Sequence, residues 1–299
     1  MPGVTGVRPV PVVSVIAALM LCICLAGCAG TPPKSSYSLD SNGFLSLTCA
    51  PFTTSEEVLF SNETYTKTRI IMHTQSGDVV MYLAAPQQPL AAVVYAPGAG
   101  ERIAAHEGRL ARYPAAGYAF AFVDIRGNGA ETPGYPLNLQ LDFERYQKGD
   151  WPQFYRTICD MSAARSLLAG RFGVPVYAAG SSNGGRYAAV AAALDPEFAG
   201  YIGISTSGFN MAGEQYGGDA GRFLLSVDPD NYIGRISPRT VWIFHSKADG
   251  IIPFDDGREL YDRARDPKTF TEFYGGHGIN GDVDDHIIAH WAQIYGTRG

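Results

Sequence analysis

The stretch that decides the fold is residues 174–194, VPVYAAGSSNGGRYAAVAAAL. An apolar run leads into the small residues GSSNG at positions 180–184, and an alanine-rich segment follows at once. This order predicts a strand, a tight turn and a helix. A Gly-x-Ser-x-Gly pentapeptide between a strand and a helix is typical of a nucleophile elbow, whose sharp turn lifts a serine hydroxyl clear of the backbone. The stretch therefore indicates Ser182 as the candidate nucleophile.

Two glycines flank this serine at a spacing that has a physical reason. Strand and helix approach each other so closely at an elbow that a side chain at Gly180 or Gly184 would collide with its neighbours. The alternative is a loop of glycine and serine without chemistry, and the pentapeptide alone fits both interpretations. The rest of the chain has to separate them.

The bulk composition is that of a folded chain with no electrostatic preference for nucleic acid. Its 299 residues are 46% hydrophobic, enough for one large domain or two small ones. The 29 acidic and 23 basic residues give a net charge of −6, so nucleic acid is not an expected partner.

Residues 1–27 are predicted to be a signal peptide. Arg8 is their only charge, and the apolar run over 10–25 is short for a helix that spans a bilayer but suits a secretory signal. The run ends in LAGC at 25–28, which resembles the prokaryotic lipobox. That resemblance implies lipidation of Cys28 and a body held at the membrane, outside the cytoplasm of a prokaryotic cell. An uncleaved membrane anchor is the alternative.

The mature chain is expected to begin with a polar, lipid-linked tether over residues 28–43, followed by one folded domain over 44–299. Cys49 and Cys159 lie within that domain. An oxidising compartment would permit a disulfide, although a separation in sequence says nothing about proximity. Because Cys159 falls in a predicted helix over 155–172, a buried free thiol is the favoured interpretation.

Apolar strands alternate with helical segments from residue 90 onward, which predicts an α/β fold with a mostly parallel sheet covered on both faces. Strand-like runs around 57–60, 66–73 and 78–84 precede the alternation and predict antiparallel edge strands. The predicted strands of the alternating part cover 92–96, 118–125, 174–179, 201–205, 240–246 and 269–274, and the predicted helices, besides the one after Ser182, cover 102–116, 155–172, 254–264 and 285–295.

Two segments interrupt the alternation. Residues 130–151 are irregular and rich in polar and aromatic side chains, and residues 206–239 contain several glycines and a short helical run. The second segment is predicted to form a small lid over the sheet. Its apolar side chains are predicted to bind the substrate, or alternatively only to anchor the lid. These candidate substrate-binding residues are Met211, Tyr216, Phe223 and Leu224.

Four motifs give the chain a resemblance to the α/β-hydrolase family, over about residues 50–296. GSSNGG resembles the elbow of dienelactone-hydrolase-like and prolyl-oligopeptidase-like members. HSKADGIIP, residues 245–253, resembles the family's acid loop, and YGGHG, residues 274–278, resembles its histidine loop. APGAG, residues 96–100, resembles its oxyanion loop. The resemblance implies an α/β-hydrolase fold with a Ser-Asp-His triad.

The residues at these positions are Ser182, Asp249 and His277, in the chain order that this fold uses. A serine hydroxyl is a poor nucleophile, so it needs a base that takes its proton during attack on a carbonyl carbon. Histidine supplies that base, and a buried carboxylate holds the imidazole in one tautomer and balances its charge. Taken singly, Asp249 also fits a helix cap and His277 a loop histidine. Because each of the three follows a predicted strand, we favour the catalytic interpretation.

Charge that builds on the carbonyl oxygen needs hydrogen-bond donors. In this fold the donors are the backbone amide after the nucleophile, here Asn183, and one from the first loop, here Ala99. Pro97 departs from the family pattern, in which histidine is most common at this position, and it has no N–H. Because the expected donor is Ala99, we expect the oxyanion hole to be retained. The proline is expected to affect the backbone path of the loop instead.

Two further groups of polar residues have a structural interpretation. Asp124 and Arg126 resemble a turn of the family whose expected role is to hold loops together. His286 and His290 are four residues apart on a predicted helix, with Asp282 and two further acids nearby, a spacing that fits a metal site. A solvated helix face with acids at its start is the favoured interpretation, and neither a metal nor a cofactor is expected.

The sequence thus predicts a serine hydrolase that cleaves a small carboxylic ester through an acyl-enzyme. A serine peptidase of the dipeptidyl or tripeptidyl type, acting on short peptides, is the alternative within the family. An inactive solute-binding lipoprotein is the alternative of another class, and it would be expected to lack a triad member. The other expected partner is the membrane, through the lipid on Cys28, and the sequence makes no prediction of oligomeric state.

Overall fold

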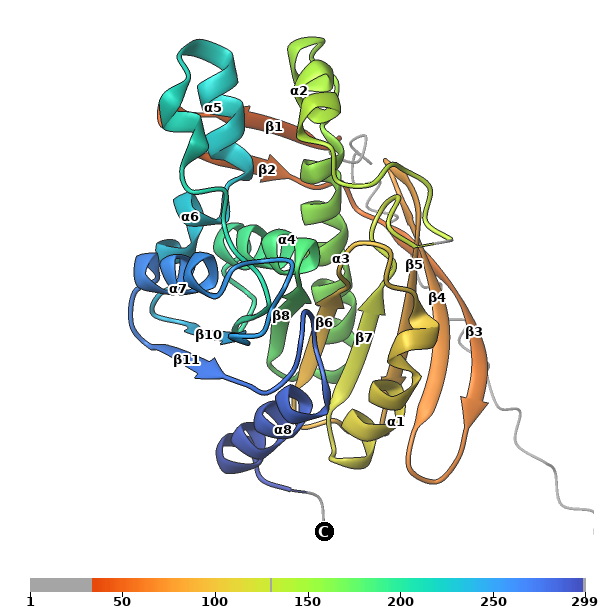
Figure 1. The fold of residues 1–299 in the computed structure, drawn as a ribbon. Coiled ribbons are helices and arrows are strands. Elements are labelled where there is room, and N and C mark those ends of the chain that lie inside the picture. The colour runs from red at the N-terminus through yellow and green to blue at the C-terminus, as the bar shows by residue number, and fades with distance from the viewer. Residues whose placement is uncertain (1–33, 130, 298–299) are drawn as a thin grey trace, which may run out of the picture. The chain divides into compact units, whose positions relative to one another are not determined.

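The computed structural model describes residues 34–129 and 131–297. Among these residues, nine strands form one sheet in the order β11-β10-β9-β8-β6-β7-β5-β4-β3 (Figure 1). Strands β6 to β11 run parallel to one another, while β3, β4 and β5 are antiparallel. The strands are β3 (Thr53–Ser61), β4 (Thr66–Thr74), β5 (Gly77–Ala85), β6 (Ala92–Ala96), β7 (Ala119–Val123), β8 (Val176–Ser181), β9 (Gly200–Ile204), β10 (Thr240–His245) and β11 (Lys268–Glu272).

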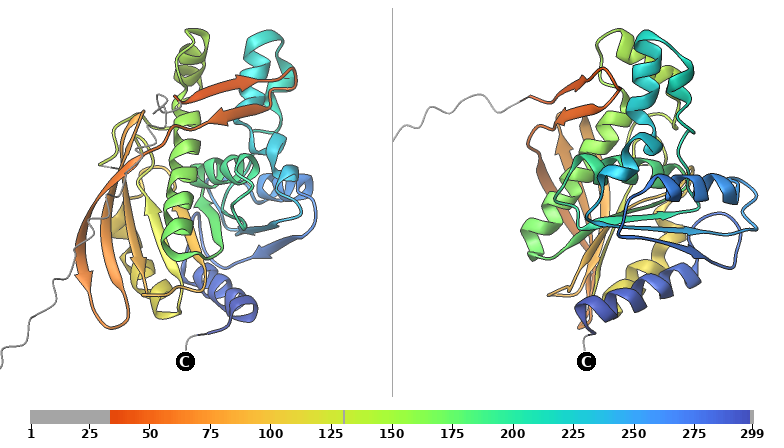
Figure 2. Two further views of the ribbon diagram at one scale, coloured as in Figure 1. Left: turned by 180° about the vertical axis from the view of Figure 1, so that it is seen from behind. Right: turned by 90° about the vertical axis from the view of Figure 1, so that its left-hand side faces the viewer.

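Helices cover both faces of the sheet (Figure 2). Successive strand residues point to opposite faces, so Val94 of β6 packs with α3 and α4, whereas Val93 and Tyr95 pack with α1 and α8. Every residue of β6 and β8 is buried, which explains their nearly continuous apolar sequences. The predicted α/β class is confirmed. The helices are α1 (Glu107–Ala115), α2 (Leu139–Gln147), α3 (Gln153–Phe172), α4 (Asn183–Leu194), α5 (Gly218–Val227), α6 (Pro229–Tyr232), α7 (Phe254–Arg263) and α8 (Gly281–Tyr295).

The three predicted edge strands are also confirmed. Strand β4 pairs antiparallel with both β3 and β5, and β5 pairs antiparallel with β7, which joins the edge to the parallel part. Gly77 closes the turn between β4 and β5 with a φ of 100°, a conformation that glycine adopts without steric cost.

Residues 34–43 differ from the predicted tether. Ser36–Leu39 forms β1, which pairs antiparallel with β2 (Leu45–Thr48). The ring of Tyr37 lies 5.1 Å from the ring of Tyr155 on α3. Because an aromatic side chain gains free energy on burial, this tyrosine holds the polar stretch against the folded body.

The predicted signal peptide, residues 1–27, and the predicted lipidation site, Cys28, lie outside the described residues. The part of the chain that the structure describes falls within one compact unit, residues 33–299. Within that part, no helix combines the length and the apolar composition that crossing a membrane requires.

The free-thiol interpretation of the two cysteines is wrong. Cys49 and Cys159 form a disulfide with their Cα atoms 5.6 Å apart. The bond joins the segment after β2 to α3 across a sequence separation of 110 residues. Such a pairing depends on how β2 docks on α3, and neither cysteine carries a local sign of it.

Part of the segment predicted to be irregular is helical. Helix α2 follows Asn138, whose side chain accepts a hydrogen bond from the amide of Leu141 at 3.0 Å. The ring of Phe143 on α2 lies 5.4 Å from the ring of Phe223 on α5, within the predicted lid. A nine-residue helix gains most of its stability from such packing, so the sequence of α2 alone did not reveal it.

Candidate active site

The predicted elbow is present, with Ser182 between β8 and α4 at a φ of 53° and a ψ of −124°. A residue with a Cβ adopts a positive φ only where its surroundings hold it. The amide of Ser182 donates to the carbonyl of Ile204 at 3.0 Å, and the hydroxyl of Thr206 donates to the carbonyl of Ser182 at 2.8 Å. Strand β9 and the loop after it therefore fix the turn.

The glycines around the nucleophile stand where no side chain fits. A Cβ at Gly180 would overlap the backbone of Gly184, and a Cβ at Gly184 would overlap the backbone of Ala96 on β6. A Cβ at Gly185 would lie 2.6 Å from the Cβ of Thr206. The close approach that the sequence predicted is thus present, and it allows α4 to start directly over the ends of the strands.

Asp249 and His277 form a pair at the end of the sheet. The imidazole Nδ1 of His277 lies 2.9 Å from each carboxylate oxygen of Asp249, whose side chain is fully buried. Burial opposes ionisation of this carboxyl, but amide donors from Ile252 and Ile251 and the contact with His277 outweigh it and hold the pKa of Asp249 below its usual range. An ionised carboxylate only accepts hydrogen bonds, so Nδ1 carries the proton and Nε2 is left as a base.

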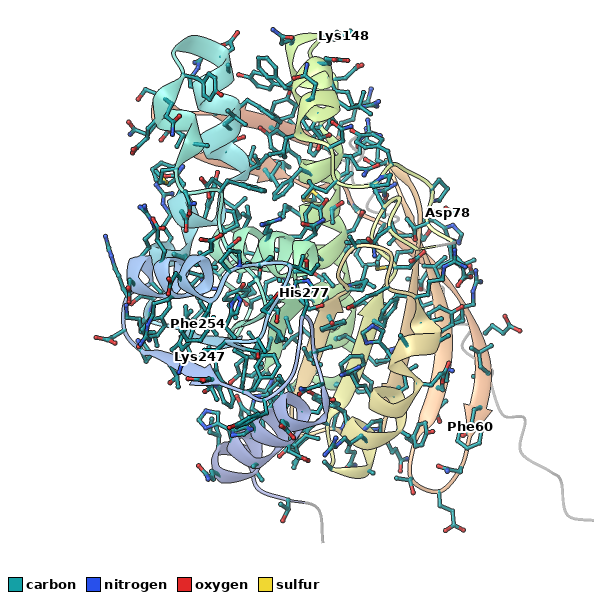
Figure 3. All side chains as sticks on the ribbon, in the orientation of Figure 1. Phe60, Asp78, Lys148, Lys247, Phe254 and His277 are labelled. Atoms are coloured by element: carbon teal, nitrogen blue, oxygen red, sulfur yellow. A yellow bond between two sulfur atoms is a disulfide. The ribbon has the colours of Figure 1, made fainter. Side chains whose placement is uncertain are left out.

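The predicted triad residues follow strands β8, β10 and β11. These strands belong to the run β11-β10-β9-β8, all parallel, so their carboxyl ends share one edge of the sheet. His277 is on the loop between β11 and α8 (Figure 3). The structure brings Asp249 and His277 into contact and places Ser182 at the same edge.

The predicted oxyanion loop is held on both sides of Ala99. The amide of Gly98 donates to Oε2 of Glu101 at 3.0 Å, and the amide of Gly100 donates to Oδ1 of Asn128 at 2.9 Å. Asn128 in turn donates from Nδ2 to the carbonyl of Gly98 at 2.7 Å. The amide of Ala99 takes part in none of these bonds. The second predicted donor, the amide of Asn183, is in the first turn of α4, where helix amides have no partner within the helix.

The turn after β7 positions the oxyanion loop through Asn128, a residue that sequence reasoning missed. The carboxylate of Asp124 accepts from the amides of Glu131 and Thr132 at 3.1 and 2.7 Å. Arg126 forms a buried ion pair with Asp160 at 2.7 Å. These contacts agree with the expected loop-holding role of the turn. Its resemblance to the family pattern was the signal that could have identified Asn128.

Arg186 connects the elbow to the loop after β9, a role that no pattern in the sequence indicated. Its Nη1 donates to Oδ1 of Asn183 at 2.7 Å, and its Nη2 donates to Oγ of Ser207 at 2.9 Å. The guanidinium also lies over the ring of Phe209, 4.7 Å from its centroid. Burial lowers the pKa of Arg186, and the charge of Asp228 opposes that shift.

Two buried carboxylates hold the next residues of this loop. Asp228 accepts from the amides of Phe209 and Met211, both at 2.9 Å, and Asp230 accepts from the amide of Asn210 at 2.8 Å. Asn210 and Met211 both have a positive φ, so these bonds maintain a strained path. Burial and the charge of Asp228 raise the pKa of Asp230 to about 7.

The candidate substrate-binding residues do not all gather in one place. Tyr216, Phe223 and Leu224 line a hollow of about 350 Å³ between α2 and α5, together with Leu139, Gln140, Phe143 and Ala220. Met211 is not part of its lining and immediately precedes a 3₁₀ turn, Ala212–Gln215. The wall contributed by α2 was missed because α2 itself was not predicted.

The two histidines of the possible metal site, His286 and His290, have their rings beside aromatic side chains of β10. The ring of His290 lies 4.7 Å from that of Trp242, and the ring of His286 lies 6.2 Å from that of Phe244, both edge to face. Among residues 34–129 and 131–297, no group of three or more histidine, cysteine, aspartate and glutamate side chains is placed to hold a metal ion.

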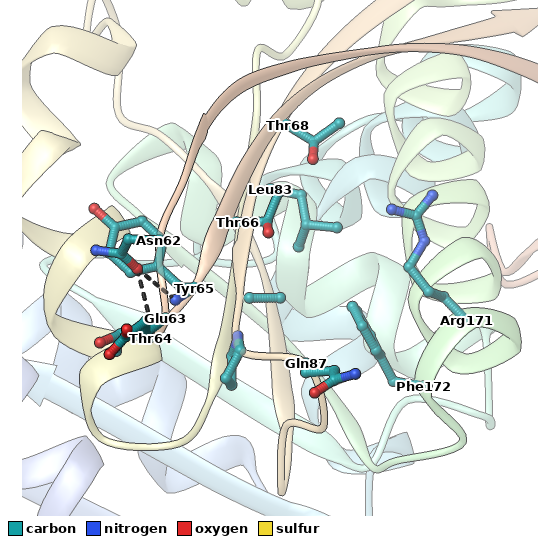
Figure 4. Close-up of a pocket in the computed structure, with 12 residues that line it drawn as sticks. Asn62, Glu63, Thr64, Tyr65, Thr66, Thr68, Leu83, Gln87, Arg171 and Phe172 are labelled. Atoms are coloured by element: carbon teal, nitrogen blue, oxygen red, sulfur yellow. Dashed lines mark hydrogen bonds between the residues drawn. The ribbon is translucent and has the colours of Figure 1, made fainter.

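A separate hollow of about 430 Å³ lies at the antiparallel end of the sheet. Figure 4 shows Arg171 and Phe172 of α3 on one side of it and Asn62 and Tyr65, from the turn between β3 and β4, on the other. None of the candidate catalytic or substrate-binding residues lines it. It is therefore distinct from the candidate active site.

Residues 87–215 match the model of a protein family described as serine aminopeptidase, S33. The chain is 27% identical over 200 residues to the uncharacterised protein YfhR of Escherichia coli, covering 66% of each chain. It is 29% identical over 223 residues to YfhR of Salmonella typhi, covering 70% of each. The match thus spans just under two thirds of the length of the Escherichia coli relative.

Solved structures share the architecture over most of the chain. Acetyl xylan esterase 1 from a Thermoanaerobacterium species is 15% identical with a TM-score of 0.63, and an acetyl xylan esterase from a Paenibacillus species is 17% identical with a TM-score of 0.65. Each match covers 82% of this chain and 89% of the other. A glucuronoyl esterase from Teredinibacter turnerae is 15% identical with a TM-score of 0.56, covering 82% and 78%. Together with the order of the strands, these similarities show that the chain has an α/β-hydrolase fold.

Proposed function

We propose that the protein is a serine hydrolase that cleaves a carboxylic ester through an acyl-enzyme, with Ser182 as nucleophile, His277 as base and Asp249 as the acid that orients it. The observation that carries the proposal is the buried Asp249 carboxylate against Nδ1 of His277, at the sheet edge where Ser182 occupies a strained elbow. A solute-binding protein has no need of this combination, which argues against the inactive alternative.

The reaction follows from the protonation states. Nε2 of His277 takes the proton of Ser182 Oγ while Oγ forms a bond to the ester carbonyl carbon. The carbon–oxygen bond to the alcohol then breaks, and the alcohol leaves with the proton from Nε2. A water molecule, activated by His277 in the same way, releases the acid and restores Ser182. Asp249 balances the positive charge of the imidazolium in both halves of the reaction.

The developing oxyanion is proposed to be stabilised by the amides of Ala99 and Asn183. Both are free of the bonds that hold their neighbours, and the start of α4 adds the positive end of a helix dipole. Loss of one such donor typically costs a factor of about 10² to 10³ in kcat.

The substrate is proposed to be a small ester whose apolar part lies in the hollow between α2 and α5, against Tyr216, Phe223 and Leu224, with Met211 on the loop that leads to it. Support for an ester comes from the esterases among the similar structures. The description of the matching family favours a second candidate, an aminopeptidase acting on short peptides. A comparison of kcat/KM for alanine p-nitroanilide and alanine p-nitrophenyl ester separates them, because only a peptidase turns over the anilide at a comparable rate.

The experiment that tests the proposal is hydrolysis of p-nitrophenyl acetate by the wild type and by Ser182→Ala. We expect the variant to lose roughly 10⁴-fold or more in kcat, because the acyl-enzyme cannot form. Ser166→Ala is the matched control, since Ser166 is exposed on α3, far along the chain from the elbow. Turnover by Ser182→Ala within tenfold of the wild type would overturn the assignment.

We further propose that residues 1–27 are a signal peptide and that Cys28 carries a lipid that holds the protein at the envelope membrane of a prokaryotic cell. The lipobox-like sequence LAGC supports this proposal. Cys28→Ser is expected to move the protein from the membrane fraction to the soluble fraction. Equal partitioning of variant and wild type would contradict it.

A further inference from the structure

One carboxylate oxygen contacts both loops that carry the proposed oxyanion donors. Oε2 of Glu101 accepts from the amide of Gly98 at 3.0 Å and from the hydroxyl of Ser181 at 3.4 Å. Gly98 directly precedes Ala99, and Ser181 is two residues before Asn183. Oε2 of Glu101 thus bridges the two segments that carry the proposed donors.

This carboxylate belongs to a network of charged and polar side chains that also includes His106, Arg109 and Asp284. Arg109 Nη1 is 3.3 Å from Nδ1 of His106, and a guanidinium only donates, so Nδ1 accepts and the imidazole proton is on Nε2. That Nε2 lies 3.2 Å from Oε2 of Glu101. At the other end, Nε of Arg109 donates to Asp284 on α8 at 3.1 Å. His106 and Asp284 are almost completely buried.

The same network contacts the histidine loop. Nη2 of Arg109 donates at 2.9 Å to the carbonyl of Ile279, two residues after His277. A Cβ built on Gly278 would lie 3.5 Å from Oε1 of Glu101. The network therefore joins the oxyanion loop, the elbow and the histidine loop, and no other group among those described above contacts all three.

Glu101 is ionised in this setting. Burial opposes its ionisation, but His106 and the amide of Gly98 outweigh burial and lower the pKa of the carboxyl. Burying charged groups is costly, and apolar residues of similar volume often stabilise a fold equally well. The charges therefore call for an explanation beyond folding stability.

We propose that Glu101 is a positioning residue that sets the spacing of the two oxyanion donors, with His106, Arg109 and Asp284 holding its carboxylate in place. The proposal rests on the proposed function, because it presupposes attack by Ser182. Glu101 itself takes no part in bond making. Its effect is on the transition state, in which the ester oxygen carries charge and shortens its bonds to both amides.

The test is the kinetics of Glu101→Gln and Glu101→Ala with p-nitrophenyl acetate, normalised to active sites titrated with a fluorophosphonate. The glutamine variant keeps an oxygen acceptor for Gly98 but loses the charge, and we expect kcat to fall roughly tenfold. The alanine variant loses the acceptor as well, and we expect a fall of roughly a hundredfold. KM is expected to change by less than about twofold, because the ground-state ester does not depend on the oxyanion donors.

Two further measurements separate positioning from a role in folding. Affinity for a trifluoromethyl ketone, whose tetrahedral adduct places an oxyanion in the hole, should fall by the same factor as kcat. Glu107→Gln is the matched control on the neighbouring helix α1, where the half-exposed Glu107 pairs with Lys67 at the surface. This variant should have the kcat and KM of the wild type.

An unchanged kcat per active site in Glu101→Gln and Glu101→Ala would overturn the inference, as would a loss confined to the number of active sites or to KM. If the alanine variant fails to fold, the glutamine variant alone decides. Failure of the proposed function is distinguishable, because it would appear as full activity in Ser182→Ala.

Discussion

The backbone of Ser182 stores strain at the point where chemistry is proposed. A positive φ at a residue with a side chain costs about 1–3 kcal/mol, so it persists only when the surrounding contacts enforce it. The bonds to Ile204 and Thr206 do so here. A residue in an ordinary Gly/Ser loop needs no such contacts, so the enforced strain favours a functional role for Ser182.

Asp249→Asn should leave a folded protein that is almost inactive. An asparagine amide can present N–H to Nδ1 of His277, which stabilises the wrong imidazole tautomer and places the proton on Nε2. We expect kcat for p-nitrophenyl acetate to fall roughly 10⁴-fold. Circular dichroism serves as the control for folding, and a variant with wild-type kcat would show that another carboxylate orients the base.

Asp230 makes stability depend on pH. Its pKa is raised from 3.8 to about 7, so between these values the folded protein keeps a proton that the unfolded chain has lost. As the pH rises from about 4 to about 7, the wild type should therefore lose stability relative to Asp230→Asn. Between the two pKa values the expected loss is about 1.4 kcal/mol of unfolding free energy per pH unit. The measurement is the free energy of unfolding in urea for both proteins.

Asp249 and Glu101 change the stability in the opposite direction with pH, which is why the wild type has to be compared with Asp230→Asn. The pKa values of Asp249 and Glu101 are lowered, so their contribution to stability is present above the unfolded pKa and is lost as the pH falls. The contributions of Asp249 and Glu101 are the same in both proteins, so they cancel when the unfolding free energy of Asp230→Asn is subtracted from that of the wild type. A difference in unfolding free energy that stays constant from pH 4 to pH 7 would contradict the raised pKa of Asp230.

At the scale of elements, α2 and α5 form a pair whose apolar sides face each other. Phe143 of α2 lies 5.4 Å from Phe223, and Leu224 of α5 lines the hollow between the helices. The predicted lid thus has a partner in a segment that showed no regular pattern. The size of the hollow, rather than the elbow, is expected to decide which acyl or alcohol groups the enzyme accepts.

Leu224→Trp should narrow the hollow and shift the preference toward short esters. We expect kcat/KM for p-nitrophenyl octanoate to fall at least roughly tenfold, with p-nitrophenyl acetate little affected. Leu59→Trp on the exposed strand β3 is the control for a surface tryptophan. Equal losses for both esters, or none, would show that the hollow does not bind the variable part of the substrate.

At the scale of the whole molecule, the sequence predicted the features that are local or periodic. The elbow follows from a strand, a glycine-flanked serine and a helix that are contiguous, and the sheet follows from the alternation of apolar runs with helices. The features that were missed depend on contacts between distant residues. Cys49 and Cys159 are 110 residues apart, and Tyr37 packs on Tyr155.

The residues of the candidate site also fall into those that the sequence predicted and those that it did not. The positions of Ser182, Asp249 and His277 after their strands were predictable, because motif and strand are adjacent in the chain. Residues that hold these loops together were not, since each works through a partner far away in sequence. Arg109, for example, contacts Asp284 across a separation of 175 residues, and the sequence around neither residue indicates this ion pair.

The measurement that tests the central claim most directly is the mapping of a fluorophosphonate adduct by mass spectrometry. Trypsin should release residues 172–186, a peptide that contains both Ser181 and Ser182. We predict that fragmentation places the adduct on Ser182, in step with loss of ester hydrolysis. An adduct on Ser181 or elsewhere, or hydrolysis that continues after the adduct has formed on Ser182, would contradict nucleophilic catalysis by Ser182.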